Sequence, residues 1–189
     1  MKLRDEGFTL IELMVTLAVL AVLVTVAVPS FVSFRQRTAL EGAAEQLSSA
    51  WDTARFEALR RDEYLYVTFK NDGGAFCVGV DEDGACDCLD ATPGVCDVSV
   101  HPGSQGEWNG VTAVGAPTMG NDTGVVVIDP KRGGLTNTGD WGGMLLKAPD
   151  GSQDYRLGFY VDTRGRAVIC QPADAPSKIP RYGDRTCAL

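Results

Sequence analysis

The sequence predicts an α+β protein in which one long N-terminal helix packs on antiparallel β-sheet and disulfides staple the domain. Three observations carry this prediction. An apolar run and then a helical apolar pattern occupy the chain up to residue 61. The 22 glycines concentrate after Gly73, which favours many turns and short strands. The cysteines are even in number and all follow the helical region.

The first element is an apolar run from Phe8 to Val28. Its only side chains that are not apolar are Thr9, Glu12, Thr16 and Thr25. The run has about the 20 residues that a helix needs to cross a bilayer. A charged side chain in that setting costs about 2.5–3.5 kcal/mol on insertion scales. Glu12 therefore indicates a function for its carboxylate.

A second helical pattern follows Pro29 and reaches Arg61. Pro29 either kinks one continuous helix or starts a second one. The apolar stripe, with spacings mostly of three and four, predicts packing on a sheet. A helix over residues 8–61 would be about 80 Å long, so its first half must lie in membrane or against other subunits. The stripe consists of Phe31, Phe34, Leu40, Ala43, Ala44, Leu47, Ala50, Trp51, Ala54, Ala58 and Leu59.

Strand-like segments fill the rest of the chain. The first two, separated by Asn71-Asp72-Gly73-Gly74, predict a hairpin. Thr163-Arg164-Gly165-Arg166 predicts a tight turn, and the proline-containing tail from Gln171 is expected to be irregular. This divides the chain into residues 1–7, an apolar helix over 8–29, an amphipathic half over 30–61 and a β-rich globular part over 62–189. The expected strands are residues 64–69, 75–80, 98–100, 111–114, 124–128, 144–147, 155–161 and 167–170.

The cysteines predict disulfides in an oxidising compartment, because they are even in number and follow an apolar anchor. We favour a bond between Cys170 and Cys187, since it closes a proline-rich C-terminal loop. In the chain-entropy model, closing a loop of this size stabilises the fold by about 3 kcal/mol. The other four are expected to pair among themselves, in an order that the sequence leaves open. These four are Cys77, Cys86, Cys88 and Cys96.

The start of the chain carries a specific motif, Gly7-Phe8-Thr9-Leu10-Ile11-Glu12 behind a leader with Lys2 and Arg4. It resembles the processing site of type IV prepilins and type II secretion pseudopilins. The resemblance implies cleavage after Gly7 by a prepilin peptidase and N-methylation of Phe8. It also implies that Glu12 neutralises the terminal amine of a neighbouring subunit in a filament, and that the helix bends or melts at Pro29 on assembly.

The segment Ala54-Arg55 followed by Glu57-Ala58-Leu59-Arg60-Arg61 runs directly into a strand. It resembles the GspH/FimT branch of pilin-like proteins and implies a pilin-like fold. The implied function is that of a minor pilin of a type IV pilus, incorporated in the filament or priming it in a tip complex. Two alternatives remain open, a minor pseudopilin of type II secretion and a DNA-binding minor pilin for natural transformation.

The same resemblance implies partners and a location. The partners are other major and minor pilins, which contact the N-terminal helix, together with the prepilin peptidase and a tip adhesin. The precursor is expected to cross the inner membrane once, and the mature protein to stand in a periplasmic or extracellular filament.

Catalysis and cofactors have little support in the sequence. The single histidine, His101, lies in a loop beside Pro102, and no nucleophile motif or phosphate-binding loop is present. We therefore expect a protein that is not an enzyme and holds no cofactor. The acidic stretch from Asp81 to Asp90 offers oxygens to Ca²⁺, but it fails the EF-hand spacing. We expect a solvated acidic loop and no metal.

The basic residues near the C-terminus are the candidates for contacts with DNA. Some FimT-type proteins bind DNA through a Gly-Arg-x-Arg motif, of which Gly165-Arg166-Ala167-Val168 lacks the second arginine. From Asp162 onward five basic residues face three acidic ones, and the chain carries a net charge of −8, so any such binding would be weak and salt-sensitive. The candidate contacts are Arg164, Arg166, Lys178, Arg181 and Arg185.

Overall fold

The computed structural model describes residues 8–90, 92, 94–137, 139–149, 155–173 and 179–187, with the backbone alone at Gln105. The predicted leader, residues 1–7, lies outside the described residues. The chain divides into two compact units, Met1–Arg35 and Gln36–Leu189, and each unit is described by itself.

Helix α1 (Leu10–Arg61) is continuous and has Pro29 inside it. The prediction of one long helix is confirmed to within two residues, and no separate second helix begins at Pro29. The helix ends with Arg60 and Arg61 in its last turn, where basic side chains favour the helix dipole. Arg61 Nε lies 3.1 Å from Glu57 Oε2, one turn earlier in the helix. Asp62 then takes a left-handed φ of 56° and stops the helix.

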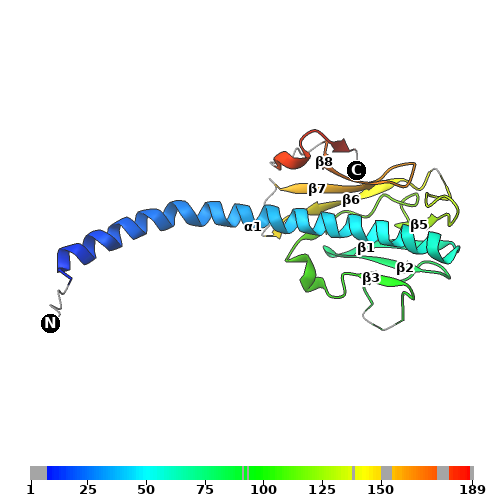
Figure 1. Ribbon diagram of the computed structural model, residues 1–189, viewed down its shortest axis with the longest axis horizontal. Helices are drawn as coiled ribbons and strands as arrows, with labels where there is room; N and C mark the ends of the chain where they lie inside the picture. Colours follow the sequence, from blue (N-terminus) through cyan, green and yellow to red (C-terminus); the bar gives the residue numbers. More distant parts are fainter. Residues whose placement is uncertain are drawn as a thin grey trace, which may run out of the picture. The chain divides into compact units, whose positions relative to one another are not determined.

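Two β-sheets complete the second unit (Figure 1). The first sheet has the order β3–β2–β1–β5. It contains β1 (Leu65–Asp72), β2 (Ala75–Asp81), β3 (Ser99–His101) and β5 (Val125–Ile128). The second has the order β4–β6–β7–β8–β9. It contains β4 (Thr112–Val114), β6 (Gly142–Lys147), β7 (Arg156–Val161), β8 (Ala167–Pro172) and β9 (Thr186–Cys187).

The eight predicted strands are confirmed, with shifts of at most three residues at their ends. One prediction was wrong. The tail was expected to be irregular, but it contains β9 and a short helix, η3 (Pro180–Tyr182). The predicted packing of a long helix on antiparallel sheet is confirmed, with one parallel pair, β9 with β8, at the edge of the second sheet. The remaining strand pairs are antiparallel.

The β1–β2 hairpin is confirmed with a shorter turn than predicted. Asp72 pairs with Ala75, so only Gly73 and Gly74 form the turn. Both have positive φ, 58° and 96°, as two-residue hairpin turns require. The strand propensity of the flanking residues therefore extends the ladder through Asn71 and Asp72.

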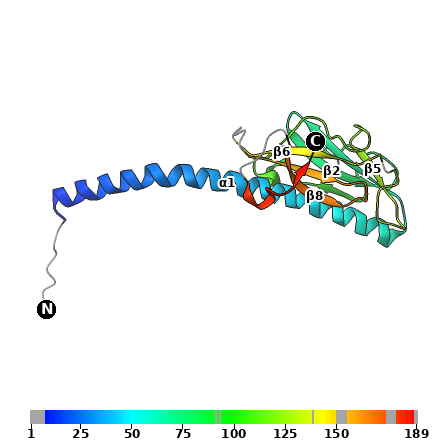
Figure 2. The same cartoon turned by 90° about the horizontal axis from the view of Figure 1, so that it is seen from above.

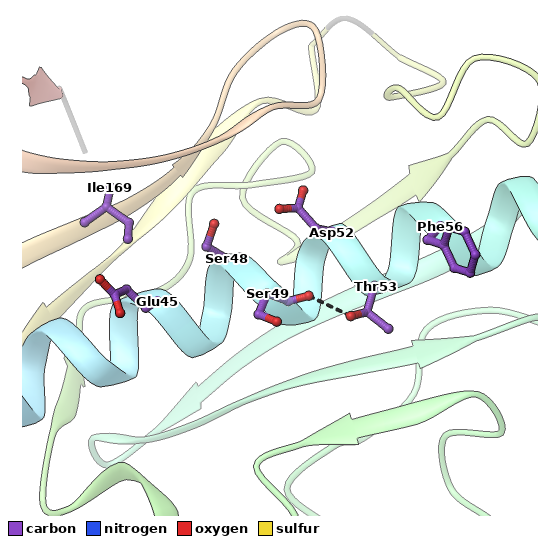
Figure 3. Close-up of a pocket in the computed structure, with 7 residues that line it drawn as sticks. All are labelled: Glu45, Ser48, Ser49, Asp52, Thr53, Phe56 and Ile169. Carbon is purple, nitrogen blue, oxygen red and sulfur yellow. Dashed lines mark hydrogen bonds between the residues drawn. The ribbon is translucent and has the colours of Figure 1, made fainter.

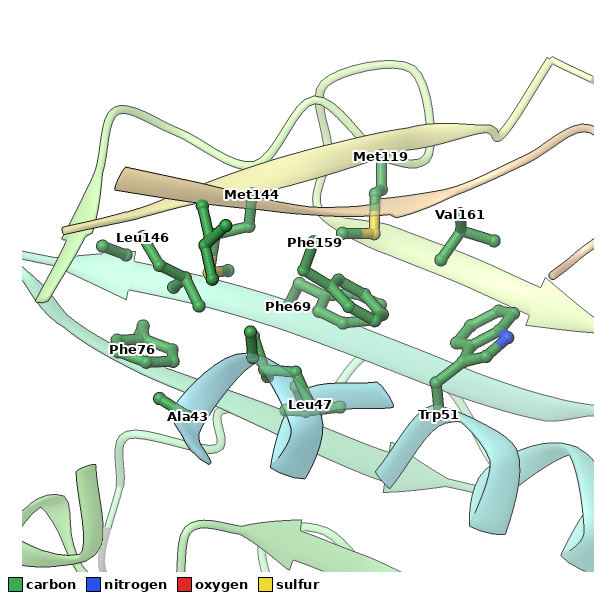
Figure 4. Close-up of a cluster of buried hydrophobic side chains, with 14 of the residues drawn as sticks. Ala43, Leu47, Trp51, Phe69, Phe76, Met119, Met144, Leu146, Phe159 and Val161 are labelled. Carbon is green, nitrogen blue, oxygen red and sulfur yellow. The ribbon is translucent and has the colours of Figure 1, made fainter. Parts of the chain in front are cut away.

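The hydrophobic core lies between the C-terminal half of α1 and the facing sides of the two sheets (Figure 4). The ring centroids of Trp51 and Phe69 are 6.2 Å apart, and those of Phe69 and Phe159 are 5.7 Å apart. These contacts link α1 through the first sheet to the second. Figure 2, seen from above, shows the part of α1 that belongs to the second unit running along the sheets.

The predicted apolar stripe of α1 is only partly buried. From Leu40 to Ala58 its members are buried in the core. Phe31 and Phe34, however, are 62% and 64% exposed, and Leu59 is 49% exposed. The prediction that these three pack on a sheet was wrong. Phe31 and Phe34 fall in the first compact unit, whereas the strands of both sheets belong to the second.

All six cysteines are paired. Cys170 bonds to Cys187, as predicted. The remaining four pair among themselves, also as predicted, as Cys77–Cys88 and Cys86–Cys96. These two bonds hold the acidic loop against the outer face of the first sheet, where the backbone N–H of Cys86 donates to Thr68 Oγ1 over 3.2 Å.

The C-terminal tail folds back onto α1. Gln171 Nε2 donates to the carbonyl of Ile179 over 2.8 Å, and the Tyr182 hydroxyl donates to Glu45 Oε1 over 3.4 Å. The disulfide between Cys170 and Cys187 therefore closes a loop that has its own contacts with the domain.

Candidate functional site

The N-terminal part of α1 carries a continuous apolar surface. Its large apolar side chains from Phe8 to Phe34 are exposed, with Phe8 at 84%. An 18-residue window in the helix has a mean hydropathy of 2.6, and none of it is buried. By length and composition this segment can cross a membrane. An exposed apolar surface of this size needs either lipid or other protein to cover it.

The polar side chains of this segment divide into satisfied hydroxyls and one free carboxylate. Thr16 and Thr25 donate to the carbonyls of Leu13 and Val22 over 2.9 and 2.7 Å, so both hydroxyls are bonded within the helix. The Glu12 carboxylate has no hydrogen bond or ion pair with any residue of the described ranges. It is the group that a partner would have to satisfy.

Glu12 also has a local role at the start of α1. Its backbone N–H donates to Thr9 Oγ1 over 3.3 Å, and Thr9 precedes the first helical residue, so Thr9 caps the helix. A carboxylate in this first turn faces the positive end of the helix dipole. The sequence-based account, which considered only the charge, missed this cap. The spacing Thr9-x-x-Glu12 could have revealed it, since it matches a capping box.

Pro29 interrupts the hydrogen-bond ladder without ending the helix. Proline has no N–H, so the carbonyl of Thr25 loses its usual partner four residues on. Ser33 Oγ donates to the carbonyl of Pro29 over 3.2 Å and to that of Ser30 over 3.0 Å. Gly7 lies outside the described residues, so cleavage between Gly7 and Phe8 and methylation of Phe8 stay predictions.

The turn between β7 and β8 holds two of the predicted DNA contacts, Arg164 and Arg166. Both backbone N–H groups donate to Asp162 Oδ1, over 2.9 and 2.8 Å. Arg166 Nε donates to Asp162 Oδ2 over 2.9 Å. Burial raises the pKa of the Asp162 carboxyl, but the hydrogen bonds from Arg166 and Arg164 outweigh it and hold the pKa below its ordinary value. The Arg166 guanidinium is thus already paired.

Gly165, the glycine of that motif, has a structural role that sequence reasoning missed. Its φ is 73°, and a Cβ there would lie 3.1 Å from the Cα of Gly134. Its carbonyl accepts a hydrogen bond from Trp51 Nε1 over 2.9 Å. The turn is therefore packed against the neighbouring loop and anchored to α1. The signal available in the sequence was Trp51 itself, since a buried indole N–H needs an acceptor.

The structure does not gather the predicted DNA contacts into one patch. Arg164 and Arg166 precede β8, whereas the carbonyl of Arg185 accepts from the N–H of Gln171 near its far end. Arg164 and Arg166 are therefore separated from Arg185 by roughly 15 Å, about the length of β8. Arg181 Nη1 lies 2.8 Å from Glu45 Oε1, so it is paired as well. Lys178 lies outside the described residues.

Two open pockets flank the exposed side of α1. The first, about 540 Å³ in volume, has a lining of mixed polar and apolar side chains (Figure 3). The second, about 450 Å³, lies beside η1 (Gln105–Trp108) and includes His101 and Glu107. No described residue near His101 forms a nucleophile–base arrangement with it. The first pocket is lined by Glu45, Ser48, Ser49, Asp52, Thr53, Phe56 and Ile169.

Two carboxylates of the acidic loop, those of Asp81 and Asp87, form hydrogen bonds or an ion pair with other groups of the same chain. Asp81 is 7% exposed and accepts backbone N–H bonds from Asp83 over 2.8 Å and from Asp97 over 3.1 Å. Asp87 pairs with Lys70, and that contact holds the pKa of the Asp87 carboxyl below its ordinary value. Within the described ranges no three His, Cys, Asp or Glu side chains are grouped to hold a metal ion.

Comparison with known proteins bears on both ends of α1. The family model for the prokaryotic N-terminal methylation motif matches residues 2–28. The model for the type II transport protein GspH matches residues 43–172. The type IV major pilin protein PilA of Myxococcus xanthus is 33% identical over 61 residues, which cover 32% of this chain. The chain thus aligns with only 28% of the length of that relative.

Two crystal structures of the type IV minor pilin FimU of Pseudomonas aeruginosa are also similar. One has a TM-score of 0.49 and 18% identity, covering 77% of this chain and 97% of FimU. The other has a TM-score of 0.46 and 19% identity, covering 74% and 98%. Likeness at that level adds nothing to the assignment, which rests on the family match. Because that match covers more than half of the chain, the protein belongs to the family of the type II transport protein GspH and carries the prokaryotic N-terminal methylation motif.

Proposed function

We propose that the protein is a minor pilin of a type IV pilus, cleaved after Gly7, N-methylated at Phe8 and incorporated in the filament or priming it in a tip complex with other minor pilins. One observation supports this most directly. The exposed apolar segment from Phe8 to Phe34 contains a single carboxylate without a partner among the described residues, and α1 joins it to the domain without a break.

The apolar segment from Phe8 to Phe34 can be covered by lipid in the precursor and by other subunits in a filament. Lipid covers its apolar side chains, so their burial alone gives no preference for a filament. Glu12 supplies the preference, because a carboxylate in the bilayer costs about 2.5–3.5 kcal/mol. Cleavage creates an amine at Phe8, and the amine of a neighbouring subunit would neutralise that carboxylate. Pairing thus removes the free-energy cost that the Glu12 carboxylate has in the bilayer, and this difference favours the assembled filament.

The same reasoning supports the partners and the location. The precursor would cross the inner membrane once, as the substrate of a prepilin peptidase. The mature chain would contact other major and minor pilins through α1, and a tip adhesin through the complex at the filament end. Its work is association, so no catalytic group is required.

A second candidate, a minor pseudopilin of type II secretion, is supported by the description of the matched family as a transport protein. Deleting the gene separates the two functions. Loss of piliation and twitching with normal exoprotein release supports the pilus, and the reverse outcome supports the secretion system. The third possibility, a DNA-binding minor pilin, gains no support from the geometry, because Arg164 and Arg166 lie at the opposite end of β8 from Arg185.

The test of the assembly mechanism is Glu12→Ala, with Thr9→Ala as its control. Glu12→Ala removes the carboxylate, whereas Thr9→Ala removes only the hydroxyl that accepts the N–H of Glu12. We expect cleavage after Gly7 in both variants and at least about tenfold less Glu12→Ala in sheared filaments, equivalent to about 1.4 kcal/mol. Thr9→Ala should be incorporated nearly as well as the wild type. Normal incorporation of Glu12→Ala would rule out the charge-pair account.

A further inference from the structure

Two aromatic side chains share the outer face of the second sheet. Trp141 directly precedes β6 and is 44% exposed, and Tyr160 lies on β7. Their ring centroids are 6.1 Å apart, with the planes tilted by 52°. Phe159 and Val161, the neighbours of Tyr160, are fully buried in the core. Since side chains alternate along a strand, Tyr160 points to the opposite side. We name this surface, around Trp141 and Tyr160, the aromatic face.

The strand register places only a glycine and a valine opposite Tyr160, which is itself half-buried. Gly143 is the β6 residue opposite Tyr160, so no cross-strand side chain from β6 covers the tyrosine ring. On the other side Tyr160 is opposite Val168 of β8, a short side chain. Trp141 reaches Tyr160 diagonally, which is the spacing at which large aromatic side chains meet on a sheet. The two tilted rings form a corner and not a flat stack.

Planar polar groups border this corner. Asp162 directly follows β7. Burial, together with the nearby Asp162 charge, raises the pKa of the Tyr160 hydroxyl, so the carboxylate lies near that ring. Arg166 lies opposite Asp162, whose N–H donates to the carbonyl of Arg166 over 3.0 Å. The Arg166 side chain is 62% exposed, so its guanidinium keeps donors directed at solvent while it pairs with Asp162. Asp162 and Arg166 thus contribute one charge of each sign beside the two rings.

We propose that the aromatic face is a binding surface for neutral carbohydrate. The C–H face of a pyranose ring is apolar and packs on an aromatic ring, while its hydroxyls bond to planar carboxylate and guanidinium groups. Both kinds of group are present here within one sheet face. The charges balance locally, which suits a neutral ligand. A polyanion would need a net positive surface, and the chain as a whole carries −8.

This inference does not depend on the filament assignment. The core shared with α1 lies on the inner side of the second sheet, and the aromatic face is on its outer side. Association through α1 would therefore leave the aromatic face accessible. Carbohydrate binding is measured on unassembled protein, so its failure and a failure of filament incorporation are separate results.

The test uses the purified full chain in an amine-oxide detergent, which has no sugar headgroup. The probes are cellohexaose, chitohexaose and mannohexaose, and an oligothymidylate as the anionic alternative. Trp51 and Trp108 are buried at 0% and 2% exposure, so a change in tryptophan emission reports on Trp141. We expect saturable binding of at least one neutral hexasaccharide, and no weakening by salt, since a neutral ligand releases no counterions.

Calorimetry then compares variants. Trp141→Ala should weaken carbohydrate binding at least about tenfold, or 1.4 kcal/mol, and Arg166→Ala should weaken it by a smaller factor. Phe56→Ala is the matched control, because Phe56 is an aromatic side chain 62% exposed on α1, and it should bind like the wild type. Absence of binding to all three sugars, undiminished binding by both Trp141→Ala and Arg166→Ala, or salt-sensitive binding of the oligothymidylate alone would overturn the proposal.

Discussion

At the scale of single residues, Gly79 on β2 shows how closely the disulfides Cys77–Cys88 and Cys86–Cys96 pack against the first sheet. A Cβ at this position would lie 2.5 Å from Cys96 Sγ and 2.6 Å from Cys86 Sγ. The backbone of Gly79 is in an ordinary strand conformation, so the constraint is contact and not φ. We predict that Gly79→Ala lowers the free energy of unfolding by about 1–3 kcal/mol, the usual cost of overpacking, as measured by urea denaturation.

Gly42→Ala is the control for that measurement. Gly42 lies within α1, and a Cβ there would meet nothing within 4 Å. Alanine is favoured over glycine in a helix by about 0.5–1 kcal/mol, so this variant should be slightly more stable than the wild type. Equal stability of Gly79→Ala and the wild type would show that the disulfides move aside at little cost.

Individual residues also show what the sequence could and could not reveal. The bond between Cys170 and Cys187 was predictable, because the two cysteines enclose one proline-rich loop. The partners of Cys77 and Cys86 were not. A bond between Cys86 and Cys88 would be strained, and the two other ways of pairing the four cysteines close loops of similar length, so only the fold decides. The role of Thr9 was missed although the spacing Thr9-x-x-Glu12 is a local signal for it. The role of Gly165 depends on a hydrogen bond from the distant Trp51 side chain, which no local pattern reveals.

At the scale of elements, the β7–β8 turn is held together by one carboxylate. Asp162 accepts two backbone N–H bonds from the turn and pairs with the Arg166 guanidinium. Asp162→Ala removes all of these, and we expect it to lower the free energy of unfolding by about 1–2 kcal/mol. Asp162→Asn keeps an oxygen for the two N–H groups and loses only the ion pair, so its cost should be about 0.2–1 kcal/mol.

The pH dependence of this effect has a defined sign. The pKa of Asp162 is lower in the folded chain than its ordinary value of 3.8, so the charged form stabilises the fold. That contribution is fully present above the ordinary pKa and is lost as pH falls through the folded value. The stability difference between the wild type and Asp162→Asn should therefore be constant near neutrality and shrink below about pH 4. A difference that grows on acidification would contradict this assignment.

The helices and strands differ in how clearly the sequence predicts them. Strands β1 to β8 are rich in apolar or β-branched residues, and each of them was predictable. Strand β9 has two residues, Thr186 and Cys187, too few for any periodic pattern. Its parallel pairing with β8 accompanies the disulfide to Cys170. The tail elements are thus fixed by a tertiary bond, and local sequence carries no signal of them.

At the scale of the whole molecule, the boundary between the two compact units falls inside α1, between Arg35 and Gln36. Apolar periodicity continues across this boundary, which explains why Phe31 and Phe34 were assigned to the core. Periodicity shows which face of a helix is apolar, but it does not show what covers that face. The domain supplies strands for the stripe from Leu40 to Ala58. Phe31 and Phe34 keep exposed apolar surface that lipid or another protein would have to cover.

That division predicts separate effects on folding and assembly. Phe31 and Phe34 are 62% and 64% exposed, so the double variant Phe31→Ser/Phe34→Ser should change the free energy of unfolding by no more than about 0.5 kcal/mol. If these rings are buried between subunits, each is worth about 1.5–3 kcal/mol there, and the variant should be strongly depleted from sheared filaments. Tyr64→Ser, at a side chain 53% exposed beyond α1, is the matched control and should be incorporated normally. Depletion with an unchanged unfolding curve would locate these side chains in a subunit contact. Normal incorporation of the double variant would instead confine the assembly surface to the segment before Pro29.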